Sequence, residues 1–244
     1  MSKVTYLDNA GFIIKTADVY YVFDYYRDPA HKLEKELKNN PDLPVIFFAS
    51  SPHTSHYNTE IFNLAQNHKR AYITANQVVS HIGDTEENVA TLTAGDKIED
   101  VLGTGTTVEA FASTESGVSF VITTKEGKVI LFGGDLAPIH LDEKSKKENP
   151  AAIKSKFETI VKRIAEEYPV IDLAFLAVDP ETGDEYAEGA KYLVENVDVK
   201  NFVPMHYHGL ADKACDFRTY NLPTDVKTSF HGFRNVGQEI NIKL

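Results

Sequence analysis

The chain has 244 residues, of which 42% are hydrophobic, so it has enough apolar material for a substantial core. Its formal net charge of −11 argues against a nucleic-acid partner, because phosphate binding requires clustered lysine and arginine. The single cysteine, Cys215, excludes an intrachain disulfide and a cysteine-rich zinc site. We find no signal pattern and no apolar run near ~20 residues, so we expect a cytoplasmic protein without membrane contact.

The first 66 residues predict four strands and two helices. Apolar and β-branched runs predict strands at 4–7, 12–14, 20–23 and 45–48. A short charged helix is predicted at 32–37. A second helix is predicted at 59–66, with Asn58 as its N-cap.

The second half of the chain repeats this alternation. Strands are predicted at 106–111, 118–122, 129–132, 173–176, 201–204 and 239–242. The clearest helix is predicted at 151–168, where apolar residues recur at helical spacing behind Asn149 as N-cap. Another helix is predicted at 185–195, and residues 142–148 are predicted to form a polar, lysine-rich loop.

This order of elements predicts the architecture. Strands followed by helices, twice over, favour two packed sheets with helices outside them. The sequence contains neither a Pro/Ser-rich linker nor a low-complexity tract. We therefore expect one α/β domain over residues 1–244, made of two similar halves.

Histidine and aspartate side chains follow several of these strands. Residues 49–58 read Ala-Ser-Ser-Pro-His-Thr-Ser-His-Tyr-Asn and contain His53 and His56. Asp135 follows two glycines after the strand at 129–132, and His206 follows the strand at 201–204. Imidazole and carboxylate are zinc ligands, although loop histidines exposed to solvent are the plain alternative for His53 and His56.

Taken together, these segments resemble the metallo-β-lactamase superfamily of metallo-hydrolases, in particular the branch related to the ascorbate-phosphate lactonase. The resemblance extends over nearly the whole chain. The segments that carry it are 6–12, 22–26, the Ser/His loop at 49–58, 132–136, 178–180 and 202–207. It implies an αββα sandwich of two mixed β-sheets flanked by helices. It also implies a cleft in which two divalent ions activate the water molecule that bridges them.

The resemblance also implies a set of metal ligands. His53 and His56 match the second and third histidines of the family's H-x-H-x-D-H loop. Asp135 matches the carboxylate that bridges two metals, and His206 matches the C-terminal histidine ligand. Asp24, at the end of a strand, matches an aspartate that supports the loop by hydrogen bonding.

Three of the family's ligand positions are serines in this chain. Ser51 and Ser113 stand in place of histidines, and Ser55 stands in place of the aspartate, so the metal motif is degenerate. The first metal position keeps only His53 and Asp135. The second keeps two histidines and a carboxylate, a recognised triad for one divalent ion. We expect at most one well-bound ion there, with His53 as a further ligand. Zinc is the first choice for this ion, and manganese, iron and nickel are alternatives. A protein that binds no metal is a further alternative.

Three residues are candidates for the chemistry itself. Asp135 would orient the attacking water. His140 and His208 would transfer protons, because an unperturbed imidazole pKa of about 6.5 suits acid–base catalysis. Exposed loop histidines without a catalytic role are the alternative reading of both.

The leading functional hypothesis is a divergent metal-dependent hydrolase of a small ester, lactone or phosphoester. The alternative is a catalytically inactive relative that acts as a binding or assembly module, because three ligands are missing. A metal-independent enzyme that uses the serines ranks last, since no base is evidently paired with Ser51 or Ser113. The expected partner is a small-molecule substrate, and a homo-oligomer is compatible with the sequence.

Overall fold

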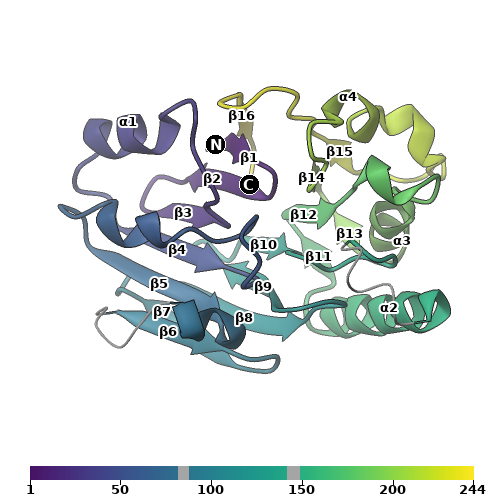
Figure 1. Ribbon diagram of the computed structural model, residues 1–244, viewed down its shortest axis with the longest axis horizontal. Helices are drawn as coiled ribbons and strands as arrows, with labels where there is room; N and C mark the ends of the chain where they lie inside the picture. The colour runs from purple at the N-terminus through teal and green to yellow at the C-terminus, as the bar shows by residue number, and fades with distance from the viewer. Residues whose placement is uncertain (82–87, 142–148) are drawn as a thin grey trace.

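Two mixed β-sheets packed face to face form the centre of the molecule (Figure 1). The computed structural model describes residues 1–81, 88–141 and 149–244, so the polar loop predicted at 142–148 lies outside the described residues. The first sheet has the strand order β16-β1-β2-β3-β4-β5-β6, and the second has the order β15-β14-β12-β10-β9-β8-β7.

The strands of the first sheet are β1 (Ser2–Asp8), β2 (Gly11–Lys15), β3 (Tyr20–Phe23), β4 (Val45–Ala49), β5 (Arg70–Ala75), β6 (Val89–Leu92) and β16 (Glu239–Ile242). Those of the second are β7 (Lys97–Val101), β8 (Thr106–Ala112), β9 (Val118–Thr123), β10 (Val129–Phe132), β12 (Leu173–Ala177), β14 (Asn201–Met205) and β15 (Ser229–Phe230). A small separate pair is formed by β11 (Val170–Ile171) and β13 (Asp198–Val199).

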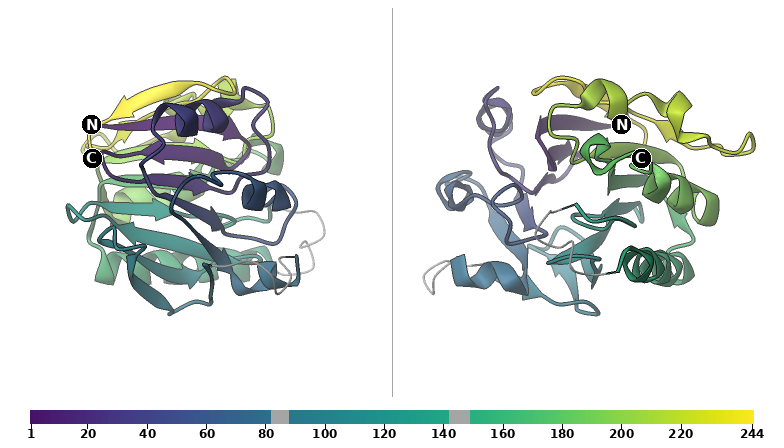
Figure 2. Two further views of the ribbon diagram at one scale, coloured as in Figure 1. Left: turned by 90° about the vertical axis from the view of Figure 1, so that its left-hand side faces the viewer. Right: turned by 45° about the vertical axis from the view of Figure 1, so that its right-hand side comes forward.

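Both sheets are built on the same plan. In the first, β1, β2 and β3 pair antiparallel, and β3, β4, β5 and β6 pair parallel. In the second, β7 to β10 pair antiparallel in order, and β10, β12, β14 and β15 pair parallel. β16 pairs with β1, with Ser2 opposite Ile242, so the two chain ends lie side by side (Figure 2). The parallel strands of each half end beside one another, which positions the loops that follow them.

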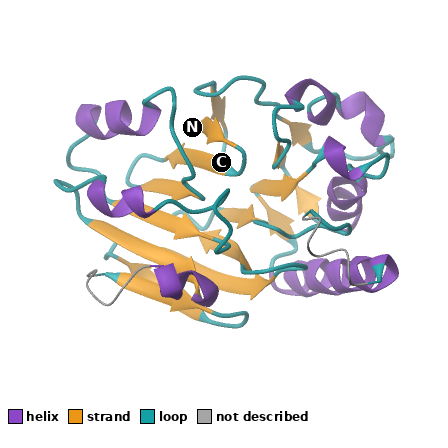
Figure 3. Ribbon diagram, in the orientation of Figure 1, coloured by secondary structure: helices purple, strands orange, loops and turns teal. Residues whose placement is uncertain are grey.

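Helices flank the two sheets, as the colours of Figure 3 show. They are α1 (Lys32–Asn39), α2 (Pro150–Glu167), α3 (Glu188–Asn196) and α4 (Ala211–Ala214), with short 3₁₀ turns at Thr59–Asn63, Asn76–His81, Pro180–Thr182 and Phe217–Tyr220. The apolar face of α2, including Phe157 and Val161, is buried. Asn149 caps this helix by accepting a hydrogen bond from the N–H of Ala151, as the sequence predicts.

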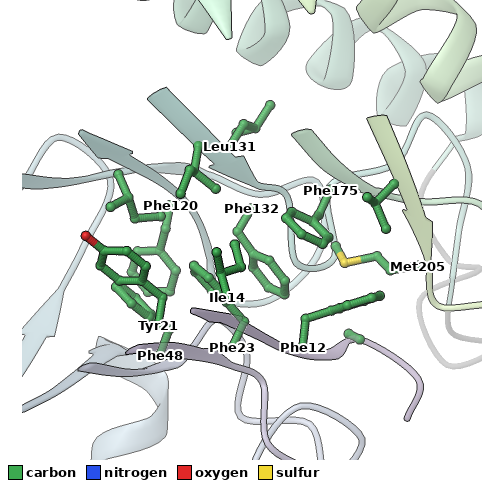
Figure 4. Close-up of a cluster of buried hydrophobic side chains, with 14 of the residues drawn as sticks. Phe12, Ile14, Tyr21, Phe23, Phe48, Phe120, Leu131, Phe132, Phe175 and Met205 are labelled. Carbon is green, nitrogen blue, oxygen red and sulfur yellow. The ribbon is translucent and has the colours of Figure 1, made fainter. Parts of the chain in front are cut away.

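Aromatic rings fill the space between the sheets (Figure 4). Phe23 of the first sheet stacks on Phe132 of the second, with ring centroids 4.5 Å apart. Phe23 also stacks on Phe48, and Phe12 packs against Phe175 across the interface. These contacts hold the two sheets, and so the loops at their ends, in one arrangement.

The predicted αββα sandwich is confirmed, and the differences are local. The expectation has no element between 67 and 105, whereas the structure has β5, β6 and β7 there. β7 lies at a sheet edge and is largely exposed, so its charged sequence Lys-Ile-Glu-Asp-Val lacks the apolar run of a buried strand. The helix predicted at 59–66 is a 3₁₀ turn, with Asn58 as its cap.

Within the described part of the chain, no helix combines the length and apolar character needed to cross a membrane.

Candidate metal centre

Five polar side chains meet where five strands end. Asp24 follows β3, His56 lies in the loop after β4, and Asp135, Asp179 and His206 follow β10, β12 and β14. β3 and β4 are parallel neighbours in one sheet, and β10, β12 and β14 are parallel neighbours in the other. Because parallel strands end at the same edge, their loops converge on one cleft.

His56 is held between two carboxylates. Its side chain is 1% exposed, with Nδ1 2.6 Å from Asp24 Oδ2 and Nε2 2.9 Å from Asp135 Oδ1. Asp24 also accepts hydrogen bonds from the backbone N–H and the hydroxyl of Ser50, which fixes the carboxylate. Burial lowers the pKa of His56, but the charges of Asp135 and Asp24 outweigh burial and raise its pKa well above the ordinary 6.5. Asp24 therefore supports the loop as expected, by direct contact with Ser50 and with the candidate ligand His56.

Asp135 is positioned by a glycine turn. Gly134 has a φ of 56°, and a Cβ added there would lie 2.6 Å from Ser50 Oγ, so glycine is the residue that fits. The Asp135 side chain is buried. Burial raises the pKa of this carboxyl, but the imidazoles of His56 and His206, with a hydrogen bond from Ser51, hold the pKa well below its usual range. Asp135 is therefore an ionised carboxylate inside the cleft.

His206 lies between two carboxylates as well. Its Nε2 is 3.8 Å from Asp135 Oδ1, and its Nδ1 is 3.6 Å from Asp179 Oδ2. His208 follows on the same loop, with Nε2 3.8 Å from Asp179 Oδ2. Burial lowers the pKa of His208, as does the neighbouring imidazole of His206. The sequence predicts Asp179 as a capping residue of a turn, and its segment at 178–180 is one of those that carry the resemblance, but the sequence does not name it as a site residue.

Four residues of this region adopt a left-handed backbone. The φ angles are 51° at Asn9, 41° at Asp24, 65° at His206 and 40° at His208. Non-glycine residues rarely adopt such angles, and where they do the surrounding structure enforces them. Asn9 is part of that structure, since its side chain donates to the carbonyl of Ser55 and its carbonyl accepts from the N–H of His206. It ties the Ser/His loop of one sheet to the His206 loop of the other.

Ser51, Ser55 and Ser113 have different surroundings. Ser51 is fully buried, its hydroxyl is 3.2 Å from that of Ser116, and it accepts a hydrogen bond from the backbone N–H of His53. Ser113 is buried too, and its hydroxyl has no hydrogen-bond partner among the described residues. Ser55 lines the cleft. Ser51 thus holds the loop together and contacts Asp135.

A cavity of about 240 Å³ opens over these groups. It is lined by His53, Ser55, His56, Glu115, Asp135, Leu141, His206 and His208. Of the two predicted proton carriers, His208 lies in this lining, and His140 is not among the described residues that form it. Glu115 was missed by the sequence reasoning, although it follows Ser113 by only two residues. The cavity is therefore polar and contains imidazole and carboxylate side chains.

The donor set fits a divalent cation. Ligand atoms of His56, Asp135 and His206 all lie within 4.8 Å of one another, and all three side chains are buried. His56 Nε2 is buried and close to Asp135, yet the two atoms are not aligned as a hydrogen bond. Two nitrogens and a carboxylate oxygen around one point are the ligands of a mononuclear site. His53 lines the same cavity but does not belong to this cluster.

Comparisons with known proteins agree with this geometry at the level of the fold. No family model matches the sequence, and no curated protein matches it. A metallo hydrolase from the archaeon Ignicoccus hospitalis has a similar structure, with a TM-score of 0.68, 15% identity, and coverage of 100% of this chain and 99% of the other.

Two further solved structures extend the comparison. The metallo-beta-lactamase fold protein YhfI from Bacillus subtilis is similar at a TM-score of 0.57 and 11% identity, over 99% of this chain and 100% of that one. The diiron beta-hydroxylase CmlA from Streptomyces venezuelae is similar at a TM-score of 0.64 and 10% identity. That match spans 99% of this chain and 54% of CmlA. The chain therefore has the metallo-β-lactamase fold, as the sequence predicts.

Proposed function

We propose that the protein is a metal-dependent hydrolase that uses one divalent cation held by His56, Asp135 and His206. The observation that carries this proposal is the convergence of these three buried side chains, from two sheets, on one point at the base of a cavity. The similarity to a metallo hydrolase of the same fold supports it. When bound, the cation would lower the pKa of a water molecule and polarise the bond to be cleaved.

The residues of the chain have separable roles in this proposal. Asp24 holds His56 in place through Nδ1, which leaves Nε2 for the cation. The ionised Asp135 contributes a ligand and orients water at the cavity base. His208 lines the cavity with a side chain that is 38% exposed, so it is placed to exchange a proton with solvent.

The cavity limits the substrate. A volume of about 240 Å³ lies below the range of about 300–1,000 Å³ typical of drug-sized ligand sites. We therefore expect the substrate to be a small ester, lactone or phosphoester. The identity of the cation is left to measurement, because imidazole and carboxylate also bind iron and manganese, and a diiron enzyme shares the fold.

Metal content and hydrolysis test the proposal together. Protein purified without chelator or metal-affinity tag is expected to hold about one equivalent of a divalent metal, which His206→Ala removes. Hydrolysis of a panel of small esters, lactones and phosphoesters should disappear with the metal. His68→Ala is the matched control, because His68 contacts the carbonyl of Leu43 and lies outside the cavity lining. Wild-type protein that binds no cation would end the proposal and favour the binding-module alternative.

A further inference from the structure

The two ring nitrogens of His206 face two different carboxylates. Nε2 lies 3.8 Å from Asp135 Oδ1, and Nδ1 lies 3.6 Å from Asp179 Oδ2. Both separations exceed the length of a hydrogen bond, which is about 2.7–3.2 Å. Nδ1 is buried and has no hydrogen-bond partner among the described residues. The space beside Nδ1 therefore needs its own explanation.

Asp179 is oriented toward that space by the local turn. Its Oδ1 accepts the N–H of Glu181 and caps the turn at Pro180–Thr182. Its Oδ2 is left facing two imidazoles, at 3.6 Å from His206 and 3.8 Å from His208. The Asp179 side chain is 3% exposed. A buried carboxylate normally has partners within hydrogen-bond distance. The longer distances from Asp179 Oδ2 to the two imidazoles leave room for an ion between these groups.

The separations are those of ligands around a shared ion. Two ligands that each lie about 2.1 Å from a tetrahedral ion are roughly 3.4 Å apart. Ligand atoms of Asp179, His206 and His208 all lie within 4.8 Å of one another. We propose that these three residues form a second position for a divalent cation, here called the outer position. The inner position is the one formed by His56, Asp135 and His206, so this inference rests on the proposed function.

The shared histidine makes the two positions compete. A neutral imidazole offers a lone pair on only one of its two nitrogens, and the other carries a proton. His206 therefore binds one cation at a time. Each chain is expected to bind one equivalent of cation in total, which occupies either the inner or the outer position. His208 is 38% exposed, whereas His56 is 1% exposed, so the outer position is the one that faces solvent. Its two imidazoles and one carboxylate suit zinc, cobalt or nickel.

Cobalt binding to variants separates the two positions. Calorimetric titration with Co²⁺ is expected to give one site in wild-type protein and in His208→Ala, which keeps the inner position. Asp135→Asn removes an inner ligand and is expected to keep one site, weakened at least tenfold. Adding His208→Ala or Asp179→Asn to Asp135→Asn should abolish that remaining site. Crystals of Asp135→Asn soaked in Co²⁺ should show an anomalous peak between Asp179 and His208.

Each contrary result has a distinct meaning. Wild-type protein that binds Co²⁺ while Asp135→Asn binds none would overturn the outer position and leave the proposed function standing. Binding by Asp135→Asn that survives both His208→Ala and Asp179→Asn would overturn it too. Wild-type protein that binds no Co²⁺ would contradict both the outer position and the proposed metal-dependent function. Circular dichroism checks folding, and His56→Gln is a second variant without the inner position should Asp135→Asn unfold.

Discussion

The imidazole rings of His56 and His206 face one another across the cleft, with centroids 5.3 Å apart and planes inclined by 31°. His56 belongs to the loop after β4 in the first sheet, and His206 follows β14 in the second. The distance between them is therefore set by how the two sheets pack. A cation held by both rings would link the two halves of the molecule, so metal binding and stability are expected to be coupled.

Replacing Asp24 by asparagine tests the support of His56. The amide cannot provide the charge that fixes the imidazole, so cation affinity is expected to fall by about 10–100-fold, the usual effect of losing such a partner. Isothermal titration of metal-free protein measures this. Asp198→Asn, an exposed aspartate paired with Lys200, is the control and should bind as wild type does. Equal affinities in the two variants would contradict the role of Asp24.

Cation affinity is expected to rise with pH. In the metal-free protein burial lowers the pKa of His56, but Asp135 and Asp24 raise it well above 6.5. The ring therefore keeps its proton at neutral pH and must release it to a cation, about one proton per ion. Titrations in buffers of different ionisation enthalpy count the released protons. Binding that releases none would show that His56 is not a ligand.

The raised pKa of His56 also predicts how the stability of the metal-free protein depends on pH. A histidine whose pKa is raised by folding stabilises the fold below its unfolded pKa, and this contribution is lost as pH rises through the folded pKa. Chelated protein is therefore expected to lose thermal stability as the pH rises from about 6.5 through the raised pKa of His56, whereas His56→Gln should not show this loss. Thermal unfolding followed by circular dichroism provides the comparison.

Ser55 and Ser51 are expected to differ in whether they accept a larger ligand side chain. Ser55 lines the cavity, so Ser55→Asp adds a carboxylate beside the cation and should tighten binding about tenfold, or about 1.4 kcal/mol. Ser51 is fully buried, so Ser51→His overfills its site and should destabilise the protein by about 1–3 kcal/mol. Metal titration and urea unfolding distinguish the two. A Ser51→His protein of wild-type stability would contradict the packing argument.

Gly134 is expected to be required for the position of Asp135. Gly134→Ala forces a side chain into a left-handed backbone and places its Cβ 2.6 Å from Ser50 Oγ. Gly127→Ala is a matched control, because Gly127 has a φ of 74° but no atom within 4 Å of an added Cβ. Both should lose about 1–3 kcal/mol from backbone strain. Only Gly134→Ala should also weaken cation binding, and equal binding by both would contradict the role of the close approach.

The sequence by itself predicted most of the architecture. Buried strands such as 20–23 and 45–48 are continuous apolar runs, and the helix at Pro150–Glu167 has a full apolar face with a capping asparagine. These signals are local, so they can be read along the chain. The exposed edge strand β7 and the two-residue strands β11, β13 and β15 were missed, because pairing with a neighbouring strand defines them and periodicity does not. β5 and β6 were missed too, although β5 is a largely buried strand.

The sequence also named His56, Asp135 and His206, through its resemblance to the metallo-β-lactamase superfamily. Only the tertiary structure decided which candidates meet. It placed His56 between Asp24 and Asp135, left His53 outside the ligand cluster, and brought Asp179 to His206. The reason is physical, since these residues are far apart along the chain and the distances between them depend on two sheets packing through buried aromatic rings. The resemblance carried by the sequence motifs identifies the candidate ligands, and the packing of the sandwich determines their geometry.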